Sequence, residues 1–294
     1  MFKNLIIYRI AGLTVDDFQR AEQSLNESAF TPCKPTEESS HGWIPPRREE
    51  NGPLIESVGG QWLLRFKTET KLLPASVIAE KVKEKAALIE QETGRKPGKR
   101  LRDEIKAEVK LDLLPKAFTK QSEVMAWINP KTDFLVIDTS SQGKADAVTT
   151  GLVKAISGIA LSLLDTQTSP ATAMAQWLST QEPPADFSID RECELKSADA
   201  DKAVVRYARH PLDIAEISAH IEEGKMPTKL AMTWRDRVSF VLTDTHQLKK
   251  IDVLDVVTND KSDTGFDADA AIITGELESL IPCLIAALGG ERAE

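Results

Sequence analysis

The segment 113–120, Leu-Leu-Pro-Lys-Ala-Phe-Thr-Lys, places one aromatic ring between two cations shortly after a proline. The proline should end a preceding helix, so the segment is expected to project as a loop. Lys116 and Lys120 could neutralise phosphates, and Phe118 could stack on a base or wedge between base steps without reading sequence. The alternative, favoured by how often aromatic residues anchor cores, is that Phe118 is buried and the lysines are merely solvated.

Metal chemistry has little support in the sequence. The histidines at 41, 210, 220 and 246 include no pair at the i, i+4 spacing that places two ligands on one helical face. The cysteines at 33, 193 and 283 are widely separated and form no Cys-x-x-Cys pair, so we expect buried thiols in a reducing cytoplasm. His220 follows Glu216 by four residues, which is typical of a surface pair on a helix. No metal and no cofactor is predicted.

Catalytic motifs are equally incomplete. The segment 94–99 resembles a phosphate-binding loop, but its glycines are one residue too close and Arg100 replaces the required Ser or Thr. Ser157 and Ser279 lack the Gly-x-Ser-x-Gly elbow, and the Glu-x-Lys form at 108–110 falls inside an expected helix. Because no second element supports any of these sites, we expect that the protein is not an enzyme.

Charge is unevenly distributed along the chain. The net charge of −9 argues at first against nucleic acid, whose binding is driven largely by cations that displace counterions from phosphates. However, residues 81–120 carry 12 basic and 7 acidic groups, and 201–250 carry 9 and 7. Residues 251–294 carry only 2 basic and 10 acidic groups. Such segregation permits a basic binding surface on an acidic protein.

Hydrophobic periodicity and turn residues predict a mixture of strands and helices without regular alternation, which is typical of the α+β class. We expect strands at 2–10, 61–67, 124–128, 134–138, 203–208, 229–234, 238–242 and 248–253. We expect helices at 15–28, 144–164, 214–223 and 273–288, and a helical hairpin formed by 74–94 and 99–115 and joined at 94–98. The Pro- and Gly-rich stretch 30–53 is predicted to be a long ordered loop anchored by Trp43.

The chain of 294 residues is long enough to bury a substantial core and is predicted to have four parts. These are an N-terminal α+β part (1–73), a basic helical hairpin with a projecting loop (74–122), a central β-hairpin and helix (123–180), and a C-terminal α+β part (181–294). The apolar start is too brief for a signal peptide, and Lys154 interrupts the apolar stretch 151–164, which falls short of the ~20 residues of a membrane span. A soluble cytoplasmic protein is expected.

Eight motifs, in order along nearly the whole chain, resemble those of the RdgC family of bacterial recombination-associated proteins. They lie at 2–5 (Phe-Lys-Asn-Leu) with 8–9, 29–33 (Ala-Phe-Thr-Pro-Cys), 42–46 (Gly-Trp-Ile-Pro-Pro), 71–74, 113–118, 220–225, 228–231 and 274–277. The resemblance implies a curved multi-part subunit with antiparallel sheets, a projecting helical hairpin and a C-terminal helix. It further implies that two such subunits form a ring-shaped homodimer around DNA. It also implies a nucleoid-associated protein that binds single- and double-stranded DNA without sequence preference and restrains RecA.

The resemblance assigns DNA contact to a cation and a phenylalanine that fall on Lys116 and Phe118. The family also has a lysine-glutamine pair near the contact between subunits, and this pair falls on Arg209 and His210. Arg209 retains the positive charge of the family's lysine, whereas His210 replaces the glutamine. The candidate DNA contacts are therefore Lys116, Phe118, Lys120, Arg206, Arg209, Lys99 and Arg100. A recombination regulator that acts by direct protein–protein contact, through its acidic C-terminal segment, is the alternative. No membrane partner is expected.

Overall fold

The computed structural model describes residues 1–197, 203–210, 212, 214–254, 256–257 and 265–292. It divides into two compact units. The larger unit comprises residues 1–27, 45–65 and 124–294, and the smaller unit comprises 28–44 and 66–123. The four-part division expected from the sequence remains a prediction.

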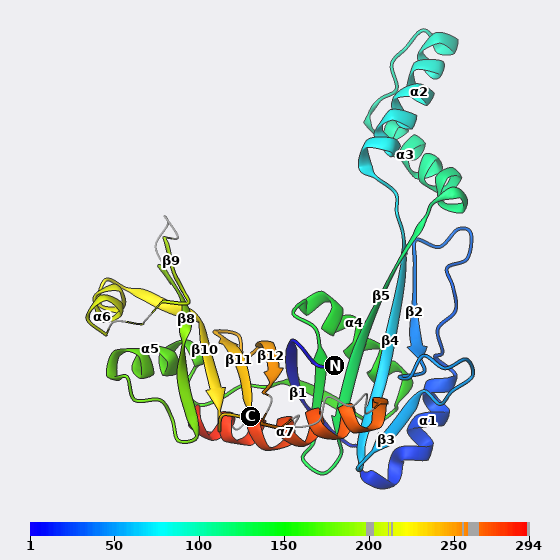
Figure 1. Cartoon of the computed structure of the whole chain (residues 1–294). Coiled ribbons are helices and arrows are strands. Elements are labelled where there is room, and N and C mark those ends of the chain that lie inside the picture. Colours follow the sequence, from blue (N-terminus) through cyan, green and yellow to red (C-terminus); the bar gives the residue numbers. More distant parts are fainter. Residues whose placement is uncertain (198–202, 211, 213, 255, 258–264, 293–294) are drawn as a thin grey trace. The chain divides into compact units, whose positions relative to one another are not determined.

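The larger unit is built on an antiparallel sheet (Figure 1). Its strands are β1 (Leu5–Ala11), β3 (Ile55–Val58), β6 (Phe134–Asp138), β7 (Ala160–Leu163), β8 (Phe187–Ser197), β9 (Val204–Ala208), β10 (Lys225–Trp234), β11 (Val238–Thr243) and β12 (Leu248–Val253). The order is β6-β1-β12-β11-β10-β8-β9, with β7 pairing β1 and β3 pairing the start of β4 (Gln61–Lys71). The end of β5 (Thr119–Asn129) pairs β6. An antiparallel sheet combined with helices confirms the expected α+β class.

Helices cover both faces of the sheet around β1, because alternate residues of this strand are buried on each side. Leu5 and Ile7 join the main core with residues of α5 (Pro170–Thr180) and α7 (Gly265–Ala287). On the opposite face, the Tyr8 hydroxyl accepts a hydrogen bond of 2.9 Å from Gln142 of α4 (Gln142–Ala155). The other helices of this unit are a 3₁₀ turn, η1 (Val15–Asp17), α1 (Phe18–Asn26) and α6 (Ile214–Glu222).

Helix α7 runs across the sheet of the larger unit (Figure 1). Within the described part of the chain, it alone is long and apolar enough to span a membrane by length and composition. Eight of its side chains are buried, and Leu277, Leu280 and Leu284 belong to the main core. Its apolar residues are thus used in packing against the sheet.

The smaller unit contains β2 (Ser39–Ile44), α2 (Ala75–Thr93), α3 (Lys99–Leu113) and the 3₁₀ turn η2 (Leu114–Lys116). Helices α2 and α3 form the expected helical hairpin. Gly94 ends α2 in the left-handed region, at φ +69°, where its N–H donates to Glu90 O at 2.8 Å. A small apolar cluster of Ile78, Ile105 and Val109 holds the two helices together.

Several expectations about the elements were wrong. The stretch expected to be a loop at 30–53 contains strand β2, although Trp43 is buried as predicted. The helix expected at 144–164 ends at Ala155, because the chain turns through Gly158 at φ +87° and β7 then pairs with β1. Strand β8 and helix α5 were not expected at all.

Gly42 is required by a close approach of two backbone segments in the smaller unit. A Cβ atom at this position would lie 2.6 Å from both Cα and N of Phe30. Gly42→Ala should therefore destabilise the protein by about 1–3 kcal/mol, because backbone must shift to accept the methyl group. Chemical denaturation measures the change.

Gly143→Ala is the matched control. Gly143 lies in the first turn of α4, where an added Cβ has no atom within 4 Å. This substitution should leave stability unchanged or raise it by up to about 1 kcal/mol, because alanine is the better helix former. Equal destabilisation by the two substitutions would contradict the steric explanation.

Candidate nucleic-acid interface

The candidate aromatic contact lies in a short connection between α3 and β5. Leu114 is buried and fixes the end of the helix, and η2 carries the chain through Pro115 to Lys116. Ala117 is extended, and β5 begins at Thr119. The loop expected at 113–120 is therefore wrong in extent, since it reduces to two residues beyond η2 and places Lys120 in a strand.

Phe118 has 85% of its surface exposed, more than any other large apolar residue among those described. The alternative in which this ring anchors a core is therefore wrong. Its backbone is nevertheless held, because Leu72 N–H donates to Phe118 O at 2.8 Å. The Lys71 ammonium donates to Leu114 O at 2.8 Å and secures the preceding turn. The ring is thus presented to solvent from a backbone that is hydrogen-bonded on both sides.

Lys116 and Lys120 are both exposed. In the part of the chain that the structure describes, neither forms an ion pair, whereas Lys85 nearby in the same unit bonds Glu108 at 3.1 Å and Asp112 at 2.8 Å. Unpaired ammonium groups can exchange solvent and counterions for phosphates without first breaking a salt bridge. The two lysines and the exposed ring together form a contact surface suited to nucleic acid, which we call the Phe118 surface.

Lys99 and Arg100 occupy the other end of α3 (Figure 1). The Arg100 side chain is 95% exposed, and its Nε lies 3.2 Å from Glu104 of the same helix. Since an α-helix rises 1.5 Å per residue, these cations lie about 20 Å along α3 from Leu113 and the Phe118 surface. The structure therefore brings Lys116, Phe118 and Lys120 together but separates Lys99 and Arg100 from them.

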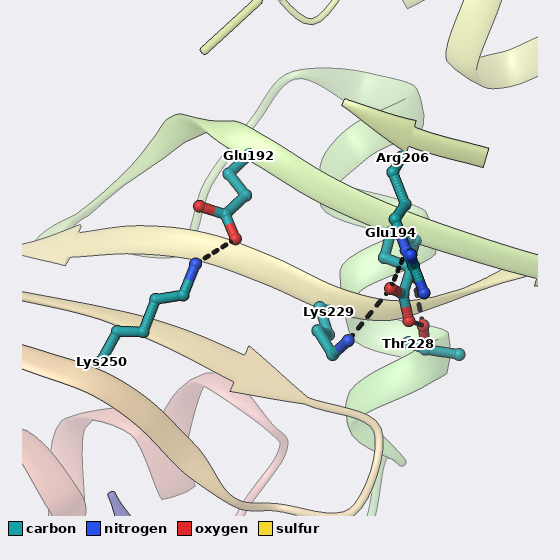
Figure 2. A network of polar contacts seen from close by, with 6 residues as sticks. All are labelled: Glu192, Glu194, Arg206, Thr228, Lys229 and Lys250. Carbon is teal, nitrogen blue, oxygen red and sulfur yellow. Dashed lines mark hydrogen bonds and ion pairs between the residues drawn. The ribbon is translucent and has the colours of Figure 1, made fainter. Parts of the chain in front are cut away.

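Arg206 and Arg209 belong to the larger unit. Arg206 lies in β9 and donates from Nε to Glu194 of the neighbouring strand β8 at 2.6 Å (Figure 2). Its side chain is still 70% exposed. Arg209 follows β9 in the left-handed region, at φ +55°, and is exposed. Arg206 thus differs from the two lysines of the Phe118 surface, because a carboxylate already offsets its charge.

Glu194 is the centre of a polar network on the sheet of the larger unit (Figure 2). Besides Arg206, it accepts hydrogen bonds from Lys229 at 3.0 Å and from the Thr228 hydroxyl at 2.9 Å. Burial would raise the pKa of Glu194, but hydrogen bonds from Lys229, Thr228 and Arg206 outweigh it and lower the pKa to about 2. The carboxylate therefore stays charged at neutral pH and holds β9 to β8 and β10.

A second ion pair extends the same network, joining Glu192 to Lys250 at 2.6 Å (Figure 2). Sequence reasoning missed Lys229 and Lys250 as members of this network because it did not predict β8. The alternation of apolar and acidic residues at 192–195, Glu-Cys-Glu-Leu, was the signal that could have found the strand.

Positive charge is concentrated in the smaller unit. This unit has 15 Lys and Arg against 12 Asp and Glu, whereas the whole chain has 37 against 46. It also contains five of the seven candidate DNA contacts. The larger unit accordingly carries the acidic excess, and the charge segregation predicted from the sequence coincides with a division of the fold.

Across the described residues, no three His, Cys, Asp or Glu side chains gather as a metal-binding group. Cys193 is buried, and burial raises the pKa of its thiol to about 12. Cys33 and Cys283 are only half-buried, so the expectation of three buried thiols was wrong for these two.

Comparison with known proteins gives matches over the full length. The family model described as "Putative exonuclease, RdgC" matches residues 1–291. A protein of Dechloromonas aromatica is 42% identical over 100% of this chain and 99% of its own length. Proteins of Cupriavidus pinatubonensis and Bordetella pertussis are 43% and 41% identical, each over 99% of both chains. All three relatives are named recombination-associated protein RdgC.

These matches place the α+β fold described above among the recombination-associated proteins. The chain belongs to the RdgC family. The resemblance carried by the eight sequence motifs is thereby confirmed.

The Glu194 network gives a pH-dependent prediction. The Glu194 carboxyl has an ordinary pKa of 4.5 and a folded pKa of about 2. Its contribution is therefore fully present above about pH 5 and is lost as pH falls toward 2. Glu194→Gln should cost on the order of 2 kcal/mol at pH 7, and the difference from wild type should shrink toward pH 2, as measured by urea denaturation.

Glu192→Gln is the control for Glu194→Gln. Glu192 also pairs with a lysine, but its side chain is 41% exposed against 14% for Glu194. Exposed pairs contribute only about 0–1 kcal/mol, so this variant should remain close to wild type at every pH. A Glu194→Gln penalty that did not change between pH 7 and pH 2 would show that charge is not its cause.

Proposed function

We propose that this protein binds single- and double-stranded DNA without sequence preference, is not catalytic, and thereby modulates RecA-dependent recombination and replication. The observation that carries the proposal is the 85% exposure of Phe118 between Lys116 and Lys120, neither of which is paired among the described residues. An exposed phenylalanine does not contribute the roughly 1.5–3 kcal/mol of stabilisation that burial of its side chain would give. A phenylalanine at this position is therefore explained better by binding than by folding.

The chemistry of these side chains suits sequence-independent contact. Ammonium groups attract phosphates, which are the same at every step of the duplex, and their binding releases counterions. An aromatic ring stacks on any base or wedges between base steps. The Phe118 surface and the pair Lys99 and Arg100 lie about 20 Å apart along α3. Phosphates of one DNA strand follow each other about every 3.4 Å along the duplex axis, so this distance corresponds to about six nucleotides.

A ring-shaped homodimer is the assembly proposed to hold the DNA. A closed two-fold ring made through two self-complementary contacts retains DNA topologically. It also allows basic groups to face inward while the exterior remains acidic. Arg206 and Arg209 of the larger unit would then add cations to the inner surface. Analytical ultracentrifugation should give twice the monomer mass of 32.4 kDa.

The protein is proposed to regulate recombination by occupying DNA that RecA needs. It is further proposed to be cytoplasmic and nucleoid-associated. The alternative is direct contact with a recombination protein through the acidic segment 251–294. The two separate in a RecA strand-exchange assay. Competitor DNA should relieve inhibition by a DNA occluder, whereas inhibition through protein contact would be unaffected by excess DNA.

The absence of catalysis is likewise a proposal, supported by the names of the relatives, which describe an association with recombination. The family model is described as an exonuclease. Incubation of end-labelled single- and double-stranded DNA with the protein and Mg²⁺ or Mn²⁺ distinguishes a non-catalytic protein from an exonuclease. Full recovery of intact strands is expected, and metal-dependent shortening would overturn the proposal.

Substitution of the Phe118 surface should weaken DNA binding in two distinguishable ways. Phe118→Ala should lower affinity about 5- to 150-fold for single-stranded DNA, because a base–aromatic stack contributes about 1–3 kcal/mol. Lys116→Ala should reduce the slope of log affinity against log salt by about 1 for duplex DNA, because one phosphate contact is lost. Fluorescence anisotropy with random-sequence DNA over a salt series measures both.

Leu88→Ala is the matched control for Phe118→Ala, because Leu88 is also an exposed apolar side chain, 58% exposed, but lies about 20 Å along α2 from the end that follows Leu72. It should bind DNA as wild type does. The site assignment fails if Phe118→Ala and Lys116→Ala leave affinity and salt slope unchanged in a folded protein, or if Leu88→Ala weakens binding equally.

A further inference from the structure

A groove of about 720 Å³ lies within the smaller unit and is not part of the Phe118 surface. One wall is α2, and the other is the basic side of α3. Glu38 and the last residues of β4, Thr70 and Lys71, also line the groove. All of its lining residues belong to one compact unit, so its shape depends on a single folded body.

The α2 wall of the groove is apolar and formed of small residues. Ala75, Ala79, Val82 and Ala86 recur at three- and four-residue spacing, which places them on one side of the helix. Ile78 lies at the base, where it belongs to the apolar cluster that joins the two helices. Alanine side chains allow the backbone of another helix to approach closely, as in other small-residue helix contacts.

The α3 wall is cationic. Arg102, Lys106 and Lys110 recur at four-residue spacing, so they form a row about 12 Å long on one side of the helix. Lys83 of α2 adds a fourth cation to the lining, and Lys71, whose ammonium donates to the backbone oxygens of Pro35 and Leu114, is the fifth. The row was not singled out from the sequence, although its spacing was visible there.

Most of this charge is not neutralised. Among the described residues, only Lys110 of these five cations has a carboxylate partner, Glu38 at 3.5 Å, which also lines the groove. Lys83, Arg102 and Lys106 form no ion pair in the same set. By contrast, on the opposite side of the hairpin the positive charge of Lys85 is neutralised by ion pairs with Glu108 and Asp112. The hairpin thus has one side whose cation is neutralised and one side on which Arg102 and Lys106 remain unpaired beside an apolar wall.

We propose that this groove binds an acidic amphipathic helix of a protein partner. Such a helix can place apolar side chains against Ala79 and Val82 while its carboxylates, spaced i, i+4, face Arg102 and Lys106 at the same spacing. Helix-in-groove recognition uses this combination of an apolar face and flanking charges. The inference goes beyond DNA binding and does not depend on the Phe118 surface.

The apolar wall distinguishes this groove from a nucleic-acid site. Nucleic-acid surfaces combine cations with aromatic rings or with groups that contact sugars and bases. The groove lining contains no aromatic residue, and its alanine wall would face the polar sugar-phosphate backbone without a matching partner. An acidic amphipathic helix satisfies both walls at once.

The test uses the full-length protein and a fluorescein-labelled helical peptide of about 16 residues, with glutamates at i, i+4 and i+8 beside a leucine stripe. A second peptide has glutamine in place of each glutamate. Anisotropy should show binding of the acidic peptide that weakens with salt, and at least tenfold weaker binding of the glutamine peptide.

Two pairs of variants test the two walls. Lys106→Glu should lower peptide affinity at least tenfold, whereas Lys81→Glu, at an exposed lysine of α2 outside the groove, should not change it. Ala79→Leu should also lower peptide affinity at least tenfold by filling the groove, whereas Ala87→Leu, an exposed position of the same helix outside the lining, should have no effect. Circular dichroism and thermal melting verify that each variant is folded.

Several results would overturn the proposal. These are no binding of the acidic peptide, equal binding of the two peptides, or equal effects of the groove and control variants. A nucleic-acid groove would instead show the same fold loss for a DNA oligonucleotide as for the peptide with Ala79→Leu. Phe118→Ala should leave peptide affinity unchanged, so failure of the DNA proposal and failure of this one are separately visible.

Discussion

The apolar contact between α2 and α3 is the interaction on which the candidate surfaces depend. Because Ile105 and Val109 turn toward Ile78, the remaining faces of α3 must point outward. The helix itself begins at Lys99, after Gly98, and ends at Leu113, beside the Phe118 surface. The contact also leaves one row of cations along the side. The cluster is small, so modest changes in it should affect every basic surface of the smaller unit together.

The two units of this protein differ in how their charged side chains are paired. In the larger unit, basic residues such as Arg206 and Lys250 bond carboxylates on the same sheet, and the half-buried Glu194 remains ionised because three donors surround it. In the smaller unit, Lys116, Lys120 and Lys106 have no such partners among the described residues. Local pairing, rather than the net charge of −9, therefore decides where an anion can bind.

The exposed ring and the groove present different chemistries within one unit. Phe118 offers an aromatic face on a hydrogen-bonded backbone, which suits bases, whereas the groove offers an alanine wall without aromatic residues. A protein with both surfaces could contact DNA and an acidic protein segment at once. Such a combination would unite the two modes of regulation, DNA occlusion and protein contact, that the sequence left as alternatives.

The sequence by itself determined the helical hairpin, the β-hairpin at 124–138, the basic segment and the family. These depend on local periodicity, on breakers such as Gly94, and on motifs read in order. Only the tertiary structure decided that β7 is a strand, because its pairing with β1 joins residues about 150 positions apart, and that β8 pairs with β10 across a register shift between Leu230 and Met232. It also decided that Phe118 is exposed and that Arg206 is paired. Exposure and pairing are set by contacts between distant segments, which local patterns of residues do not record.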